Sequence, residues 1–302
     1  KKIPPIFKKI MYNKSVINIF LVIAFPLLFY IAHYYCHFLI WIAFAPIILL
    51  MLRNKILISS FYLLLTVFFA TGLQVYFVKD FDLRYLFLSF VFVSAVYYFS
   101  LFICLVLYKK IKYPLSLFIL PIVWLIVVNS ANLVKGGNFW FNYSYLQPTL
   151  FPFTWLVGGQ GMNFLITLVN SLLAFYLFNK NRKSLYIMLI VVFFLASCFL
   201  YSMTAEPNGR KITVALIQGG ITSDWYGRIN SAEEILDVYE RLSLESSRVK
   251  PDIIIWPEFA IMKDIKQDNY FYDRISNIAK NTNAILVFGS IEVTDETDPQ
   301  FN

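Results

Sequence analysis

The decisive stretch of this sequence is PDIIIWPEFA, residues 251–260. An apolar run at 252–256 predicts a buried strand. Pro257 has a fixed φ angle and no N–H, so the strand is expected to end there. Glu258 then lies at the strand end beside Trp256, where a carboxylate can serve as a general base. A solvated loop glutamate is the alternative interpretation.

Strands and helices alternate on both sides of this stretch. An apolar run begins at Ile212, and Ser231 is a good helix N-cap, followed by Glu233 and Glu234 in the first turn. Such alternation is typical of a layered α/β domain. The expected elements are strands at 212–217, 252–256 and 284–288, and helices at 231–248 and 270–280.

The composition changes abruptly upstream of this domain. The chain has 302 residues and is 59% hydrophobic, whereas soluble proteins are about 45–50% apolar. The excess must face lipid. We therefore predict a polytopic α-helical membrane domain at 1–202, a linker at 203–210 containing the turn EPNG, and an α/β domain at 211–302.

Seven apolar runs are long enough, or nearly so, to cross roughly 30 Å of hydrocarbon as helices. Irregular backbone cannot face lipid, so helices are expected rather than open strands. The spans are predicted near 15–32, 37–52, 56–78, 84–108, 114–132, 155–178 and 184–202.

The charges predict which way these spans run. Of the 16 Lys and Arg residues in 1–202, 13 lie in the N-terminal segment and in alternate loops. The positive-inside rule then places the N-terminus in the cytoplasm and, after seven crossings, residues 203–302 outside. The membrane part carries +14 and the remainder −6. The basic balance thus indicates topology and anionic head groups rather than nucleic acid.

No metal or cofactor site is predicted. The three cysteines, Cys36, Cys104 and Cys198, lie in or beside apolar runs without a zinc or redox spacing. His33 and His37 are four residues apart, but interfacial side chains are the better interpretation beside Tyr34 and Tyr35.

The loop at 133–154 is rich in aromatic residues, including Trp140 and Tyr143. It is either an interfacial aromatic belt or a re-entrant loop that shapes a lipid-facing site.

Several motifs resemble known proteins. The segment Trp256-Pro257-Glu258 resembles the glutamate motif of the nitrilase superfamily, and 214–219 and 287–290 are similar to two of its strands. Membrane spans followed by such a domain resemble the apolipoprotein N-acyltransferase family. The span GMNFLITLVN, 161–170, is similar to that family's G-x-x-F-x-x-x-x-x-N pattern, and 139–144 loosely resembles its FPW…GYS loop.

The resemblance implies an αββα sandwich with a Glu–Lys–Cys set. The Cys takes an acyl chain from a phospholipid as a thioester and passes it to the N-terminal diacylglyceryl-cysteine of a lipoprotein. Only the Glu carries over, to Glu258. The family's Lys, Cys and last span are expected beyond residue 302, so we expect a C-terminally truncated fragment. Trp225, Trp140 and Tyr143 are the predicted substrate contacts.

The resemblance also implies a bacterial inner-membrane location with the α/β domain in the periplasm. The expected partners are a phospholipid donor, a lipoprotein acceptor and the membrane, with the protein acting as a monomer.

Two alternatives stay open. One is a membrane-tethered nitrilase-type amidase with a small substrate. The other is a non-catalytic sensor or transporter, which predicts polar or charged residues inside the spans. Asn18, Gln74 and Asn163 are the main polar residues there, and this scarcity counts against transport.

Overall fold

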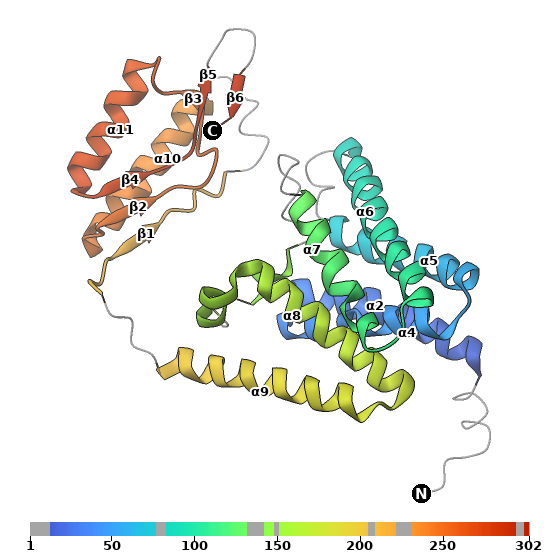
Figure 1. The fold of residues 1–302 in the computed structure, drawn as a ribbon. Helices are drawn as coiled ribbons and strands as arrows, with labels where there is room; N and C mark the ends of the chain where they lie inside the picture. Colours follow the sequence, from blue (N-terminus) through green and yellow to red (C-terminus); the bar gives the residue numbers. More distant parts are fainter. Residues whose placement is uncertain are drawn as a thin grey trace, which may run out of the picture. The chain divides into compact units, whose positions relative to one another are not determined.

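The computed structural model describes residues 13–76, 83–131, 142–147, 151–204, 209–221, 231–293 and 299–301; the side chains of 131, 151–156, 202, 231, 292–293 and 299–301 lie outside this description. The chain divides into two compact units, Lys1–Glu206 and Pro207–Asn302. Each unit is described by itself (Figure 1).

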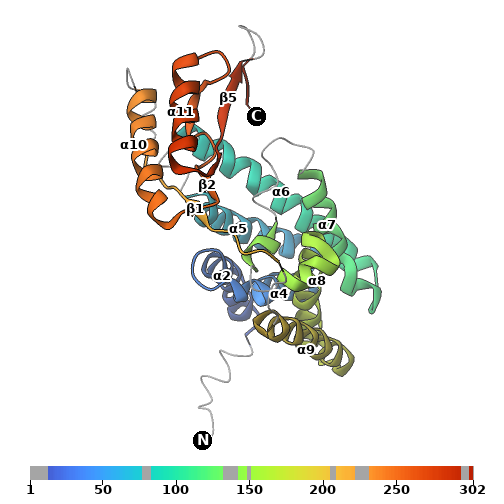
Figure 2. The same cartoon turned by 90° about the vertical axis from the view of Figure 1, so that its left-hand side faces the viewer.

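Unit 1 is an α-helical bundle, and every apolar run predicted as a span contains helical structure (Figures 1 and 2). Among the described residues, five helices are long and apolar enough to cross a membrane, and two shorter apolar helical segments lie at His37–Arg53 and Leu115–Ser130. The protein is thus a multi-pass membrane protein, while the count of seven crossings stays a prediction. The helices are α2 (Lys14–Tyr34), α3 (Ile40–Ala43), α4 (Ala45–Arg53), α5 (Ile56–Val75), α6 (Leu83–Lys110), α7 (Ile119–Ala131), α8 (Phe151–Asn179) and α9 (Arg182–Thr204), with 3-10 turns η1 (His37–Leu39), η3 (Leu115–Phe118) and η5 (Tyr143–Leu146).

The second apolar run is interrupted at Phe44, between α3 and α4. Asn170 of α8 satisfies the backbone at this break. Its side-chain oxygen accepts hydrogen bonds from the Phe44 and Ala45 N–H groups at 2.8 and 3.0 Å, and its amide donates to Ile40 O and Ile166 O. A helix break inside lipid needs such partners, because no water is present to replace them.

The described residues of unit 2 form two small sheets. In the first, the parallel strands β1 (Val214–Leu216), β2 (Ile253–Ile255) and β4 (Ile285–Val287) lie in the order β1-β2-β4. In the second, β5 (Ser290–Val293) pairs parallel with β3 (Ile261–Asp264) and antiparallel with β6 (Pro299–Phe301). The first sheet matches the three predicted strands. The second was not predicted.

Two amphipathic helices, α10 (Ser231–Ser246) and α11 (Asn269–Thr282), pack against each other and against the first sheet (Figures 1 and 2). Both fall where helices are predicted. Ile254 is fully buried among their apolar residues, with Ala215 and Leu286 beside it. The strands and helices of unit 2 therefore form an α/β unit.

The opposite face of the first sheet is apolar and uncovered by the described residues. Successive side chains of a strand point to opposite faces of the sheet. Leu216 and Ile285 are next in sequence to Ala215 and Leu286, which face the helices, so they point away from the helices. They are 76% and 65% exposed, and Val214 and Val287 on the same face are also exposed.

Candidate active site

The carboxyl ends of β1, β2 and β4 meet at one edge of the sheet, because the three strands are parallel. In open α/β sheets, ligands bind outside this edge. Gly219 follows β1, Glu258 follows β2 and Gly289 follows β4. Glu258 thus follows the middle strand, where residues from both neighbouring strand ends can surround it.

Glu258 lies in a turn directly after β2, and its side chain is exposed. The Ala260 N–H donates to Pro257 O at 3.2 Å and closes the turn. Phe259 has φ 55°, in the left-handed region that side-chain-bearing residues rarely adopt. The chain therefore turns sharply at the predicted base, and the carboxylate is available to a substrate.

Trp256 anchors this turn to the helix layer. Its indole is buried, with its ring stacked on Tyr239 at 5.0 Å between centroids and tilted against Phe288 at 5.3 Å. Its Nε1–H donates to Ser243 Oγ at 2.9 Å. Gly219 lies against Tyr239, since a Cβ there would come within 3.0 Å of the ring. The sequence analysis identified Trp256 and Glu258 but not Ser243 and Tyr239. The sequence feature that could have indicated these two is their place on the buried face of the amphipathic helix α10.

The structure describes one of the three residues that were predicted to contact the substrate. Trp140 and Trp225 lie outside the described residues. Tyr143 is described and is 1% exposed. Its hydroxyl shares a 2.8 Å hydrogen bond with that of Tyr97, and its ring stacks on Trp124 at 5.2 Å. These contacts favour a packing role for Tyr143, and its contact with substrate stays a prediction.

The 161–170 motif has a structural explanation. Asn163 accepts a hydrogen bond from the Tyr143 N–H at 2.9 Å and donates to Asn142 Oδ1, so it fixes the 142–147 loop. Asn170 serves the break at Phe44. The two amides are seven residues apart, so they lie on one face of α8. Both are fully buried. The two polar residues in this apolar span therefore serve packing inside the bundle, where each binds backbone groups of another segment.

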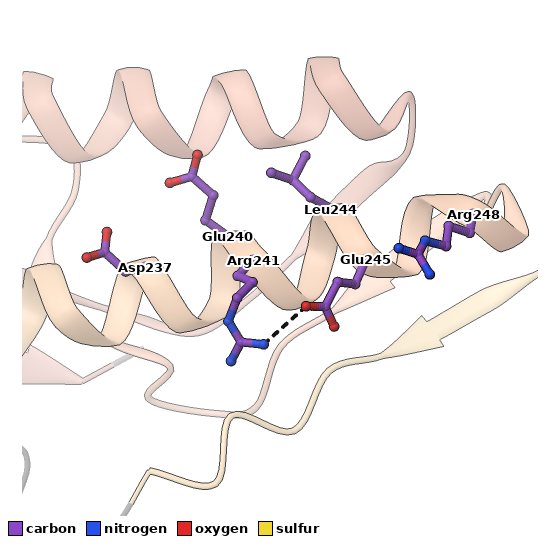
Figure 3. A pocket seen from close by; sticks show the side chains of 6 residues that line it. All are labelled: Asp237, Glu240, Arg241, Leu244, Glu245 and Arg248. Atoms are coloured by element: carbon purple, nitrogen blue, oxygen red, sulfur yellow. Dashed lines mark hydrogen bonds and ion pairs between the residues drawn. The ribbon is translucent and has the colours of Figure 1, made fainter.

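A hollow of about 480 Å³ on the surface of α10 is lined mainly by charged residues (Figure 3). Arg241 reaches Glu245 at 3.1 Å, as the figure shows. Arg274 of α11 binds Asp237 at 2.8 Å and also Glu240. Four of the charged residues that line the hollow are thus already in ion pairs, either with each other or with Arg274. We therefore interpret the hollow as a solvated helix surface rather than a second site. Its lining is Asp237, Glu240, Arg241, Leu244, Glu245 and Arg248.

The histidine pair is also accounted for by hydrogen bonds. His33 Nδ1 lies 2.9 Å from Phe29 O, and His37 Nδ1 lies 2.9 Å from Ala32 O. Among the described residues, no group of three His, Cys, Asp or Glu side chains is placed to hold a metal ion.

Fold and site together define a class: a multi-pass membrane protein with an α/β unit whose middle strand ends in an exposed carboxylate. No family model matches the chain. Six curated proteins do match, each named apolipoprotein N-acyltransferase, and they confirm the resemblance predicted from the sequence.

Three of these relatives show the extent of the likeness. The protein of Shewanella oneidensis is 27% identical over 183 residues, which is 60% of this chain and 35% of the relative. That of Geobacter metallireducens is 26% identical over 182 residues, 56% and 35%. That of Coxiella burnetii is 26% identical over 225 residues, 70% and 45%. The matches thus span less than half the length of these relatives.

Proposed function

We propose that this protein is an acyltransferase that N-acylates lipoproteins, moving an acyl chain from a phospholipid to the amine of an N-terminal diacylglyceryl-cysteine. The observation that carries the proposal is the match to six proteins named apolipoprotein N-acyltransferase. It is supported by Glu258, which follows the middle strand of a parallel sheet with its carboxylate exposed.

In this proposal Glu258 is the general base of a two-step reaction. It takes the proton from a cysteine thiol, and the thiolate attacks the ester carbonyl of the phospholipid. The lysophospholipid alkoxide leaves with a proton, and the acyl chain stays as a thioester. The lipoprotein amine then attacks the thioester, losing a proton as the amide forms and the thiol is restored.

The thiol and the lysine of this scheme are implied by the resemblance alone. Residues 207–302 contain no cysteine, and the three cysteines of the chain lie in unit 1. The experiments below therefore use the protein made from its complete gene.

The open face of the first sheet supports an αββα sandwich. Leu216 and Ile285 are large apolar side chains on a face that the described residues leave exposed. Apolar sheet faces are normally covered by a second layer. A second sheet over this face would complete the sandwich, with Glu258 at its edge.

The bias of Lys and Arg toward alternate loops supports an orientation with unit 2 in the periplasm of a bacterial inner membrane. Helical structure in all seven predicted runs supports the odd number of crossings that this orientation requires. We also propose that the enzyme acts as a monomer on lipid and lipoprotein. Two buried polar side chains of the bundle, Asn18 and Asn54, exchange amide hydrogen bonds at 3.0 and 3.1 Å. This pairing supports packing rather than a transport path.

The test is formation of the acyl-enzyme. Glu258→Gln removes the base while keeping the size of the side chain, and we expect thioester formation from a radiolabelled phospholipid to fall at least about 100-fold, the usual share of a general base. The matched control is Glu234→Gln, an exposed glutamate on α10, which should behave as wild type. Undiminished thioester in Glu258→Gln would remove the base role.

The amidase alternative differs in its donor. An amidase would form its acyl-enzyme from a water-soluble amide and not from phospholipid in vesicles, and the same assay with both donors separates the two functions. A non-catalytic sensor would form an acyl-enzyme with neither.

A further inference from the structure

We propose that Gly289 is a positioning residue for Glu258, and that the absence of a side chain at 289 fixes where the carboxylate lies. This inference rests on the proposed function of Glu258 as the base. The two residues come from different strands, since Gly289 follows β4 and Glu258 follows β2.

Gly289 touches the backbone of the Glu258 turn directly. A Cβ built on Gly289 would lie 2.9 Å from the Phe259 amide nitrogen and 3.2 Å from the Glu258 Cα. Carbon atoms at ordinary van der Waals contact are about 3.5–4.0 Å apart. The obstructing atoms belong to backbone rather than to the flexible end of a side chain, so no rotamer change makes room for a methyl group.

Both sides of this contact are held by the sheets. The Trp256 N–H donates to Val287 O at 2.9 Å, just before the contact. The Ile261 N–H donates to Gly289 O at 3.4 Å, just after it. The strand ends cannot separate without breaking these bonds. A methyl group at 289 is therefore expected to displace the short turn between them, which holds Glu258.

The conformation of the turn fits this role. Pro257 fixes φ on one side of Glu258, and Phe259 adopts φ 55° on the other. A bulky residue in the left-handed region is an outlier that persists only where its surroundings impose it. The missing side chain at Gly289 leaves the room that the Phe259 amide needs in this conformation. The backbone on both sides of the carboxylate is thus restrained.

The first measurement compares Gly289→Ala with Gly209→Ala in the protein made from its complete gene. A Cβ at Gly209 would have nothing within 4 Å, so the control should keep the wild-type rate. We expect Gly289→Ala to lower the rate constant of thioester formation at least about tenfold while the KM for phospholipid changes less than about twofold. A purely structural role would instead reduce the folded fraction, measured by thermal unfolding, and leave the rate per folded molecule unchanged.

The second measurement is a double-mutant cycle with Glu258→Asp, which keeps a carboxylate but shortens its reach. If Gly289 acts through Glu258, the aspartate costs much less in the Gly289→Ala background than in the wild-type background, because the carboxylate is already out of place. If the losses from the two single substitutions simply multiply in the double mutant, the inference is overturned, as it is by a Gly289→Ala rate constant above about one tenth of the wild-type value. Undiminished thioester formation in Glu258→Gln would instead defeat the proposed function, whatever Gly289→Ala does.

Discussion

The indole N–H of Trp256 donates a hydrogen bond to Ser243 Oγ at 2.9 Å in the core of unit 2. Ser243 is fully buried on α10, and Trp256 is the first residue after β2. The bond therefore ties the strand that presents Glu258 to the helix layer beneath it.

This bond predicts a specific cost for removing the serine. Ser243→Ala leaves a buried indole N–H without its partner, and we expect the free energy of unfolding of unit 2 to fall by about 1–3 kcal/mol. The measurement is denaturant unfolding followed by Trp fluorescence. Ser247→Ala, in the 3-10 turn that directly follows α10, should change this free energy by less than about 0.5 kcal/mol. Equal effects of the two substitutions would show that the buried bond contributes nothing.

Asn170 gives a prediction for the membrane bundle. Asn170→Leu has similar volume but leaves the Phe44 and Ala45 N–H groups unpaired at the helix break. We expect a loss of about 1–3 kcal/mol, seen as a lower unfolding temperature in detergent. The control is Asn129→Leu, since Asn129 is exposed and its amide donates within its own helix, to Leu125 O. If both variants unfold at the same temperature, the break does not depend on Asn170.

Asp268 gives a pH-dependent prediction. It caps α11 by accepting from the Tyr270 and Phe271 N–H groups, and Lys263 lies 2.5 Å from its other oxygen. The hydrogen bond from Lys263 is the main reason that the pKa of Asp268 lies below 3.8. A lowered folded-state pKa means that the stabilisation is present above the unfolded-state value and is lost as pH falls through the folded one.

We therefore expect hydrogen-exchange protection of the Tyr270 and Phe271 amides to decline as pH falls below about 3.8, the unperturbed Asp value. Lys263→Met should move this decline to higher pH. Asp268→Asn keeps a capping side chain that does not titrate, so its protection should be insensitive to pH in this range. A decline of the same size in Asp268→Asn would assign the effect to another group.

The topology is tested with a reporter fused after Gly209. The Lys and Arg bias puts the N-terminus in the cytoplasm and residues 203–302 outside. A reporter that is active only in the cytoplasm should be silent at this position, while the same reporter at the N-terminus should be active. Activity after Gly209 would mean an even number of crossings before it.

Much of the secondary structure could be predicted because its causes are local. The strands β1, β2 and β4 are short apolar runs between turn residues, and α10 begins where Ser231 and two glutamates favour a helix start. The second sheet was missed because its pairing is not local: β3 joins β5 across α11, and neither strand is a continuous apolar run.

Local features of the sequence were enough to predict the membrane bundle and the place of Glu258 after a strand. Apolar length and charge bias act segment by segment, and a Trp-Pro-Glu after an apolar run ends a strand wherever that strand lies. Three other features became visible only in the folded chain: Tyr143 is buried against Tyr97, Asn170 binds the backbone at the Phe44 break, and Gly289 lies against the Glu258 turn. Each of these is a contact between residues far apart in the chain, and close packing rather than local preference brings such residues together.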